Sequence, residues 1–165
     1  MALNIKRIRR IAIAVLDIED AVNQFKKLFN IDPFDWGEVP ELKYKWVAFR
    51  FGTDGANQCS MEFLSPMNDP KGTMLIGKFI KKHGEGLYMV TLETEEKDVK
   101  VTEAKMRTMG IEPSYENGIF LEGPDYKSWT ETYISPKDTH GVLFVLAHIV
   151  PKLPKHKGRL PKFPK

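Results

Sequence analysis

The chain has 165 residues, of which 42% are hydrophobic and 28% charged, and its formal net charge is +3. This composition is typical of a globular protein, and no apolar run approaches the roughly 20 residues that a membrane-spanning helix needs. A single cysteine, Cys59, excludes an internal disulfide and a CxxC metal or redox motif. We therefore expect a cytoplasmic protein with no membrane partner.

The net charge hides an asymmetry, because residues 150–165 contain six of the 25 cations and none of the 22 acidic residues. The rest of the chain is thus net acidic. A basic, proline-rich tail can contact nucleic acid or anionic lipid. We expect instead a solvated extension, or an arm that lies over a neighbouring subunit, and no nucleic-acid partner.

The first predicted elements lie in residues 10–33, RIAIAVLDIEDAVNQFKKLFNIDP. A short alternating strand leads into an acidic helix start at Asp17. Apolar residues then recur at helical spacing, at Ile18, Val22, Phe25, Leu28 and Phe29. Strands follow at residues 43–52 and 57–66, joined by a hairpin turn at residues 53–56. Residues 73–83 (TMLIGKFIKKH) predict a short connecting helix that ends before Gly84.

The same pattern returns about 80 residues later, in residues 89–113, MVTLETEEKDVKVTEAKMRTMGIEP. Its helix has a less regular apolar stripe: Val99, Val101, Ala104, Met106 and Met109. Strands at residues 127–136 and 141–148 complete a second βαβββ unit. At the joint, HGEGLYMVTLET, a strand follows the two glycines, whereas a phosphate-binding loop would lead into a helix. We interpret Gly84 as the chain reversal after the connecting helix.

Two tandem βαβββ units resemble the vicinal oxygen chelate superfamily of glyoxalases, bleomycin-resistance proteins and extradiol dioxygenases. The segments IAIAVLDIEDAVNQFKKLF, MEFLSP, IGKFIKKHGEGLYMV and SPKDTHGVLFVL are similar to those of methylmalonyl-CoA epimerases, over about residues 10–148. The resemblance implies an α+β fold in which the two units form a curved mixed sheet (the glyoxalase fold), and a homodimer. The boundaries that we predict are 8–68 for the first unit, 69–84 for the connector, 85–149 for the second unit and 150–165 for the tail.

In that family four ligands on the concave face hold a divalent metal, typically His, Gln or Glu, His and Glu. Carried over by position, they fall on Arg10, Glu62, Met89 and Val145. Arginine stays protonated and has no lone pair to offer a metal, and the valine side chain has no atom that can bind one. A thioether is a poor ligand for metals that prefer oxygen. We therefore predict that the metal has been lost and that no cofactor replaces it.

Strand alternation predicts which residues share the concave face with these positions. Thr91 should accompany Met89, Ala147 should accompany Val145, and Arg10 and Glu62 should be the charged members of a small apolar face. One interpretation is that Arg10 and Glu62 pair with each other in place of the metal. The other is that Arg10 binds a carboxylate or enolate oxygen, while Glu62 orients it or acts as a base.

Further candidates come from the family resemblance and from side-chain chemistry. Glu41, in VPE, matches a glutamate that the epimerases use to move a proton next to a thioester, although a surface glutamate is the alternative. His140 is either a general acid or an exposed turn residue. Among the aromatic residues, Trp46, Trp129 and Tyr133 either stack on a flat ligand or belong to the core.

Three functions stay open. The first is a metal-independent isomerase, epimerase or lyase that acts on a small carboxylate or an acyl-CoA, with Glu41 as base and Arg10 as oxyanion partner. The alternative is a non-catalytic protein of the bleomycin-resistance type that sequesters a planar aromatic ligand. The third is a scaffold or regulatory partner that uses the basic tail.

Overall fold

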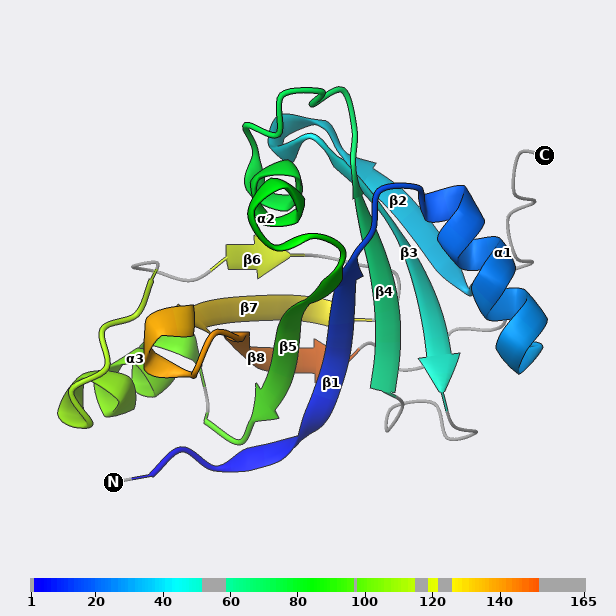
Figure 1. Cartoon of the computed structure of the whole chain (residues 1–165). Coiled ribbons are helices and arrows are strands. Elements are labelled where there is room, and N and C mark those ends of the chain that lie inside the picture. Colours follow the sequence, from blue (N-terminus) through cyan, green and yellow to red (C-terminus); the bar gives the residue numbers. More distant parts are fainter. Residues whose placement is uncertain (1, 52–58, 97, 115–118, 122–125, 152–165) are drawn as a thin grey trace. The chain divides into compact units, whose positions relative to one another are not determined.

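The computed structural model describes residues 2–51, 59–96, 98–114, 119–121 and 126–151 (Figure 1). Contacts within the chain divide it into two units. Residues 11–88 belong to the first-repeat unit, and the described residues up to 10 and from 89 belong to the second-repeat unit. Strands β1 (Ile5–Ala14) and β5 (Gly86–Thr94) each continue along the chain from one unit into the other.

The first-repeat unit contains the last part of β1, helix α1 (Ile18–Phe29), and strands β2 (Asp35–Val39), β3 (Tyr44–Phe51) and β4 (Cys59–Pro66). Its strands are ordered β2-β3-β4-β1, and β3 is antiparallel to both β2 and β4. The Asp17 side chain caps α1 by accepting from the backbone N–H groups of Glu19 and Asp20. Asn30 ends the helix in the left-handed conformation, with φ of 52°.

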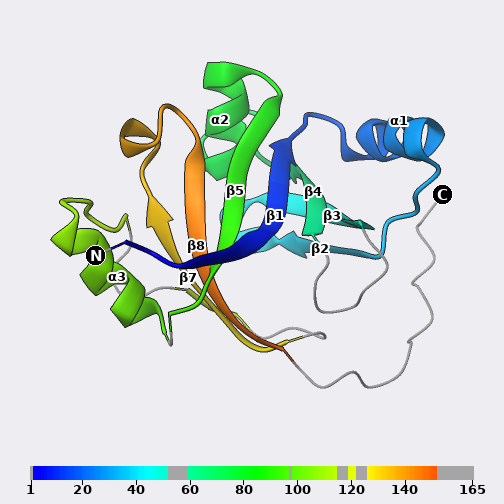
Figure 2. The ribbon, with the colours of Figure 1, turned by 90° about the horizontal axis from the view of Figure 1, so that it is seen from below.

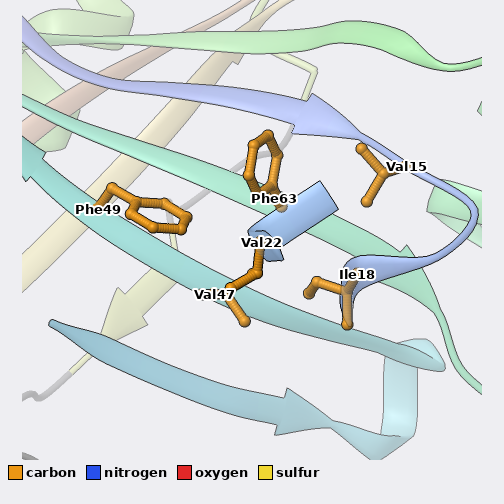
Figure 3. Packing of buried hydrophobic residues seen from close by; sticks show 6 residues of the cluster. All are labelled: Val15, Ile18, Val22, Val47, Phe49 and Phe63. Atoms are coloured by element: carbon orange, nitrogen blue, oxygen red, sulfur yellow. The ribbon is translucent and has the colours of Figure 1, made fainter. Parts of the chain in front are cut away.

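Helix α1 packs on one face of β3 and β4 (Figure 3). The buried residues of this core are Val15, Ile18, Val22, Val47, Phe49 and Phe63. The ring of Phe25 lies 4.8 Å from that of Phe49 and 5.3 Å from that of Phe63, between centroids. Two residues of the predicted apolar stripe are exposed, Leu28 at 72% and Phe29 at 55%.

The connector is helix α2 (Leu75–His83), which begins two residues later than predicted. The Asp69 carboxylate accepts from the backbone N–H and hydroxyl of Thr73 and from the N–H of Met74, just before the helix. Gly84 ends α2 with φ of 78°, and β5 follows, which confirms the predicted chain reversal. Tyr88 meets Phe79 of α2 edge-on at 5.2 Å between ring centroids, so its side chain points toward this helix.

The second-repeat unit contains the first part of β1, most of β5, helix α3 (Val99–Thr108), and strands β6 (Ile119–Leu121), β7 (Tyr126–Ile134) and β8 (Leu143–Pro151). Its strands are ordered β1-β5-β8-β7-β6. Strands β5 and β8 are parallel, whereas β7 is antiparallel to β8 and to β6, so this sheet is mixed. Figure 2 shows β5, β8 and β7 side by side.

Helix α3 buries a different stripe from the one that its apolar residues indicated. Val101 and Met109, two members of the irregular apolar stripe, are 40% and 38% exposed. The buried residues are Val99, Thr102, Glu103 and Met106. Thr102 and Glu103 each lie three or four residues from Val99 and from Met106, so these two polar residues occupy positions of the buried face where the sequence pattern would place apolar ones.

Both units have the predicted order βαβββ, and the α+β fold class is confirmed. The predicted hairpin turn at residues 53–56 and residues 152–165 of the basic tail lie outside the described residues. Among the described residues, no helix has the length and hydropathy to cross a membrane.

Candidate functional site

One face of the second-repeat unit combines buried charges with a floor of small residues. Val145 and Ala147 of β8 are fully buried. Val145 lies in register with Thr91 of β5 on one side and Tyr133 of β7 on the other. Ala147 lies in the same way between Glu93 and Glu131. Because register partners and alternate residues of a strand share a face, these six residues form one surface, which we call the polar face.

Glu131 is the centre of the hydrogen bonds on this face. Its Oε1 accepts from Nη2 of Arg10 at 2.8 Å and from Nε1 of Trp129 at 2.6 Å, and its Oε2 accepts from the Tyr133 hydroxyl at 2.8 Å. The Glu131 side chain is only 4% exposed. A buried carboxylate needs such partners, because an uncompensated charge in the interior is costly.

Arg10 is held from three sides. Its Nε donates to the Thr91 hydroxyl at 3.2 Å and its Nη2 to Glu131, while its guanidinium carbon lies 5.1 Å from the ring centroid of Trp129, within cation–π range. The Arg10 side chain is 14% exposed. The result is a nearly buried cation with a fixed orientation.

A second arginine–glutamate pair lies on the other side of Ala147. Arg7 donates from Nε and Nη2 to the two oxygens of Glu93, at 2.7 and 3.2 Å, and Nζ of Lys6 is 3.7 Å from the same carboxylate. The hydrogen bond and the charge of Glu93 raise the pKa of Arg7 above its ordinary value, against the opposing effect of burial. Here both carboxylate oxygens bind one guanidinium group, a geometry typical of a closed ion pair.

The structure brings three predicted site residues together, namely Arg10, Trp129 and Tyr133. Met89 is on β5 two residues before Thr91, in register with Leu143, and is partly buried. His140 is exposed in the turn before β8, with φ of 55°. That exposure agrees with the turn interpretation of His140.

The other three candidates belong to the first-repeat unit. Glu41 is exposed in a single 3-10 turn (Pro40–Leu42) between β2 and β3. Glu62 is in register with Ala48, the residue two positions after Trp46, and both Glu62 and Trp46 are half-buried. Alternation places both on the sheet face opposite the α1 core, which is the face predicted for Glu62. A Cβ on Gly37 would come within 3.0 Å of the Trp46 indole, so that ring lies directly on the glycine.

Sequence reasoning missed Glu131, Glu93 and Arg7. A usable pattern was present, since Trp129, Glu131 and Tyr133 alternate along one strand and must share a face. The pairing of Arg10 with Glu62 stays a prediction.

The residues at the family's four ligand positions do not fit a divalent metal. The Arg10 guanidinium offers only hydrogen-bond donors and no lone pair for a metal, Val145 has no polar side-chain atom, and the Met89 thioether suits softer metals. Glu62 is the one conventional ligand among them. No cluster of three or more His, Cys, Asp or Glu residues suited to a metal occurs among the described residues.

The fold and the repeat define the class of protein. The chain belongs to the Glyoxalase/Bleomycin resistance protein/Dioxygenase superfamily, whose sequence model matches residues 9–125. A comparison with curated protein sequences gives no match.

Among solved structures, the chain is similar to methylmalonyl-CoA epimerases. A Ser-to-Thr variant of the Streptomyces coelicolor epimerase in complex with 2-nitronate-propionyl-CoA is 24% identical, with a TM-score of 0.71 over 89% of this chain and 95% of that one. The Mycobacterium tuberculosis epimerase is 19% identical, with a TM-score of 0.71 over 92% and 93% of the two chains. A third epimerase structure is 21% identical, with a TM-score of 0.74 over 92% and 99%. At these identities the likeness establishes the fold.

Proposed function

We propose that this protein is a metal-independent enzyme that moves a proton next to the carbonyl of a small carboxylate or acyl-CoA substrate, as an isomerase, epimerase or lyase. The observation that carries the proposal is Arg10, a nearly buried and fixed guanidinium at a position where relatives bind a metal. A cation there can stabilise the oxyanion of an enolate.

The chemistry assigns a role to each group. A carboxylate base removes the proton from the α-carbon, the C–H electron pair moves into an enolate, and Arg10 binds the enolate oxygen. Reprotonation of the carbon returns the proton. Glu41 is the base in this proposal, with Glu62 and His140 as further proton-transfer candidates, and Trp46, Met89, Trp129 and Tyr133 contact the substrate.

A proton-exchange assay tests the reaction without knowledge of the product. The protein is dialysed against a chelator and incubated in D2O with methylmalonyl-CoA or propionyl-CoA, and mass spectrometry follows deuterium at the α-carbon. We expect exchange that Glu41→Gln and Arg10→Lys each reduce by at least about 100-fold, in the usual range for a general base or an oxyanion donor. Lys43→Ala, two residues after Glu41, is the control and should retain full exchange.

Two outcomes would contradict the proposal. If Glu41→Gln and wild type exchange deuterium at the same rate, Glu41 is not the base. If exchange disappears after chelation and returns with a stoichiometric divalent ion, the metal-independent mechanism is wrong.

The second candidate function is a ligand-sequestering protein of the bleomycin-resistance type. It is favoured by the exposure of Glu41 and His140 and by the flat seat of Trp46 on Gly37. In that case acyl-CoAs or aromatic acids would raise the melting temperature, because a ligand of the folded state stabilises it, but no substrate would exchange deuterium. For either function we expect a cytoplasmic homodimer, and size-exclusion chromatography with light scattering tests the dimer.

A further inference from the structure

The polar face carries two glutamates that are similar in position and burial but bind arginine differently. Glu93 and Glu131 flank Ala147 in register, and they are 4% and 3% exposed. Glu93 binds Arg7 through both of its oxygens. Glu131 instead uses one oxygen for Arg10 and Trp129 and the other for Tyr133.

This difference changes what each arginine can do. In the Arg7–Glu93 pair, two nitrogens of the guanidinium group bind the two oxygens of the carboxylate. We therefore assign Arg7 a structural role. Glu131 binds Arg10 at a single nitrogen, and its other two hydrogen bonds come from neutral donors, Trp129 and Tyr133. Glu131 thus anchors Arg10 at Nη2 and does not pair with the whole guanidinium edge.

Trp129 makes this anchor rigid because it acts on both partners. Its indole Nε1–H fixes the Glu131 carboxylate, and its ring packs against the Arg10 guanidinium. The Thr91 hydroxyl, on the neighbouring strand β5, accepts a hydrogen bond from Arg10 Nε. Underneath, Val145 and Ala147 supply no polar side-chain atom, so Thr91, Glu131 and Trp129 each contribute to the orientation of Arg10.

We propose that Glu131 is a positioning residue: together with Trp129 it holds Arg10 in the orientation in which Arg10 binds the anionic oxygen of a substrate. Glu93, by contrast, has only a structural role. The part that concerns substrate rests on the proposed function of Arg10, whereas the orientation of Arg10 can be tested without any substrate.

The test compares Glu131→Asp with Glu93→Asp. Both substitutions keep the charge, so the long-range field stays the same, and both shorten a buried carboxylate by one methylene. The probe is 2-nitronate-propionyl-CoA, a planar anion that resembles an enolate. We expect Glu131→Asp to weaken its binding about tenfold, as for the loss of one hydrogen bond to a charged group, and Glu93→Asp to leave the dissociation constant within about twofold. Both variants should lower the melting temperature by similar amounts.

Nitrogen-15 NMR gives the readout that needs no substrate. The Trp129 indole N–H signal and the Arg10 Nε–H signal, assigned with Trp129→Phe and Arg10→Lys, should both shift in Glu131→Asp and stay in place in Glu93→Asp. If neither signal moves in Glu131→Asp, or if both glutamate variants weaken binding equally, Glu131 does not position Arg10.

A separate result distinguishes the failure of the proposed function. If Arg10→Lys binds the probe as tightly as wild type, Arg10 does not bind substrate, and the NMR shifts alone decide whether Glu131 orients it. Should Glu131→Asp fail to fold, Trp129→Phe serves instead, because it keeps a ring beside Arg10 but removes one donor to Glu131. It should shift the Arg10 Nε–H signal, and an unchanged signal would overturn the positioning role.

Discussion

Gly77, in the first turn of α2, offers a sharp test of how the connector packs. A Cβ at this position would lie 2.9 Å from Cα of Gly72 and still closer to a carboxylate oxygen of Asp69. Two effects of Gly77→Ala oppose each other. Alanine is about 1 kcal/mol better than glycine in a helix interior, whereas an extra methyl group in a packed site costs about 1–3 kcal/mol.

The packing cost should prevail, because neither neighbour can move easily. Gly72 contacts the site with its backbone, and Asp69 is held by three hydrogen bonds to Thr73 and Met74. We therefore expect Gly77→Ala to lower the free energy of unfolding by about 1–2 kcal/mol, measured by urea titration. Lys78→Ala, on the exposed side of the same helix, should change it by less than about 0.5 kcal/mol.

A double-mutant cycle identifies the clash. Asp69→Ala removes the carboxylate that the new methyl group would meet, so Gly77→Ala should cost less in the Asp69→Ala background than in wild type, by at least about 0.5 kcal/mol. If Gly77→Ala is as stable as wild type, helix propensity outweighs packing and this account of the connector is wrong.

Three further predictions concern the fold. Phe49→Ala should cost about 3–5 kcal/mol in urea unfolding, while Leu28→Ala, at a 72% exposed position, should cost little. Asp17→Ala should cost about 1 kcal/mol by removing the cap of α1, and circular dichroism should show earlier loss of helix on heating. Hydrogen bonds from Thr73 and Met74 lower the pKa of Asp69 from 3.8 to about 2. The stability that these bonds provide is therefore present above pH 3.8 and is lost as the pH falls toward 2, and Asp69→Asn should remove this part of the acid dependence.

The fold was predictable because the pattern of one βαβββ unit occurs twice in the sequence. The helix of each repeat begins at an aspartate cap, Asp17 in α1 and Asp98 in α3, and strand alternation correctly assigned Glu62 to the face opposite the α1 core. What the apolar pattern did not predict is which helix residues are buried. Leu28 is apolar but exposed, and Glu103 is polar but buried, so hydrophobicity alone misplaces both residues.

The candidate site was only partly predictable, since its central contacts join residues far apart in the sequence. The ion pair of Arg10 and Glu131 spans 121 positions, and that of Arg7 and Glu93 spans 86. The spacing of residues along one strand identifies those that share a face of the sheet, but it does not identify the residue on another strand with which each of them pairs. The positions of the family's metal ligands therefore directed the search for a partner of Arg10 to Glu62 and away from β7.

A physical argument nevertheless leads from Arg10 to Glu131. A guanidinium among small apolar residues needs a carboxylate within reach, because burying it without one costs several kcal/mol. On β7 the alternation of Trp129, Glu131 and Tyr133 presents one acid between two hydrogen-bond donors, which is the surrounding that a buried carboxylate requires. A single acidic residue between aromatic residues on one strand face is thus a strong indicator of a buried cation within reach of it. Where a cation occupies the position of a metal ligand, the carboxylate that pairs with it should be sought on such a strand as well as at the other metal-ligand positions.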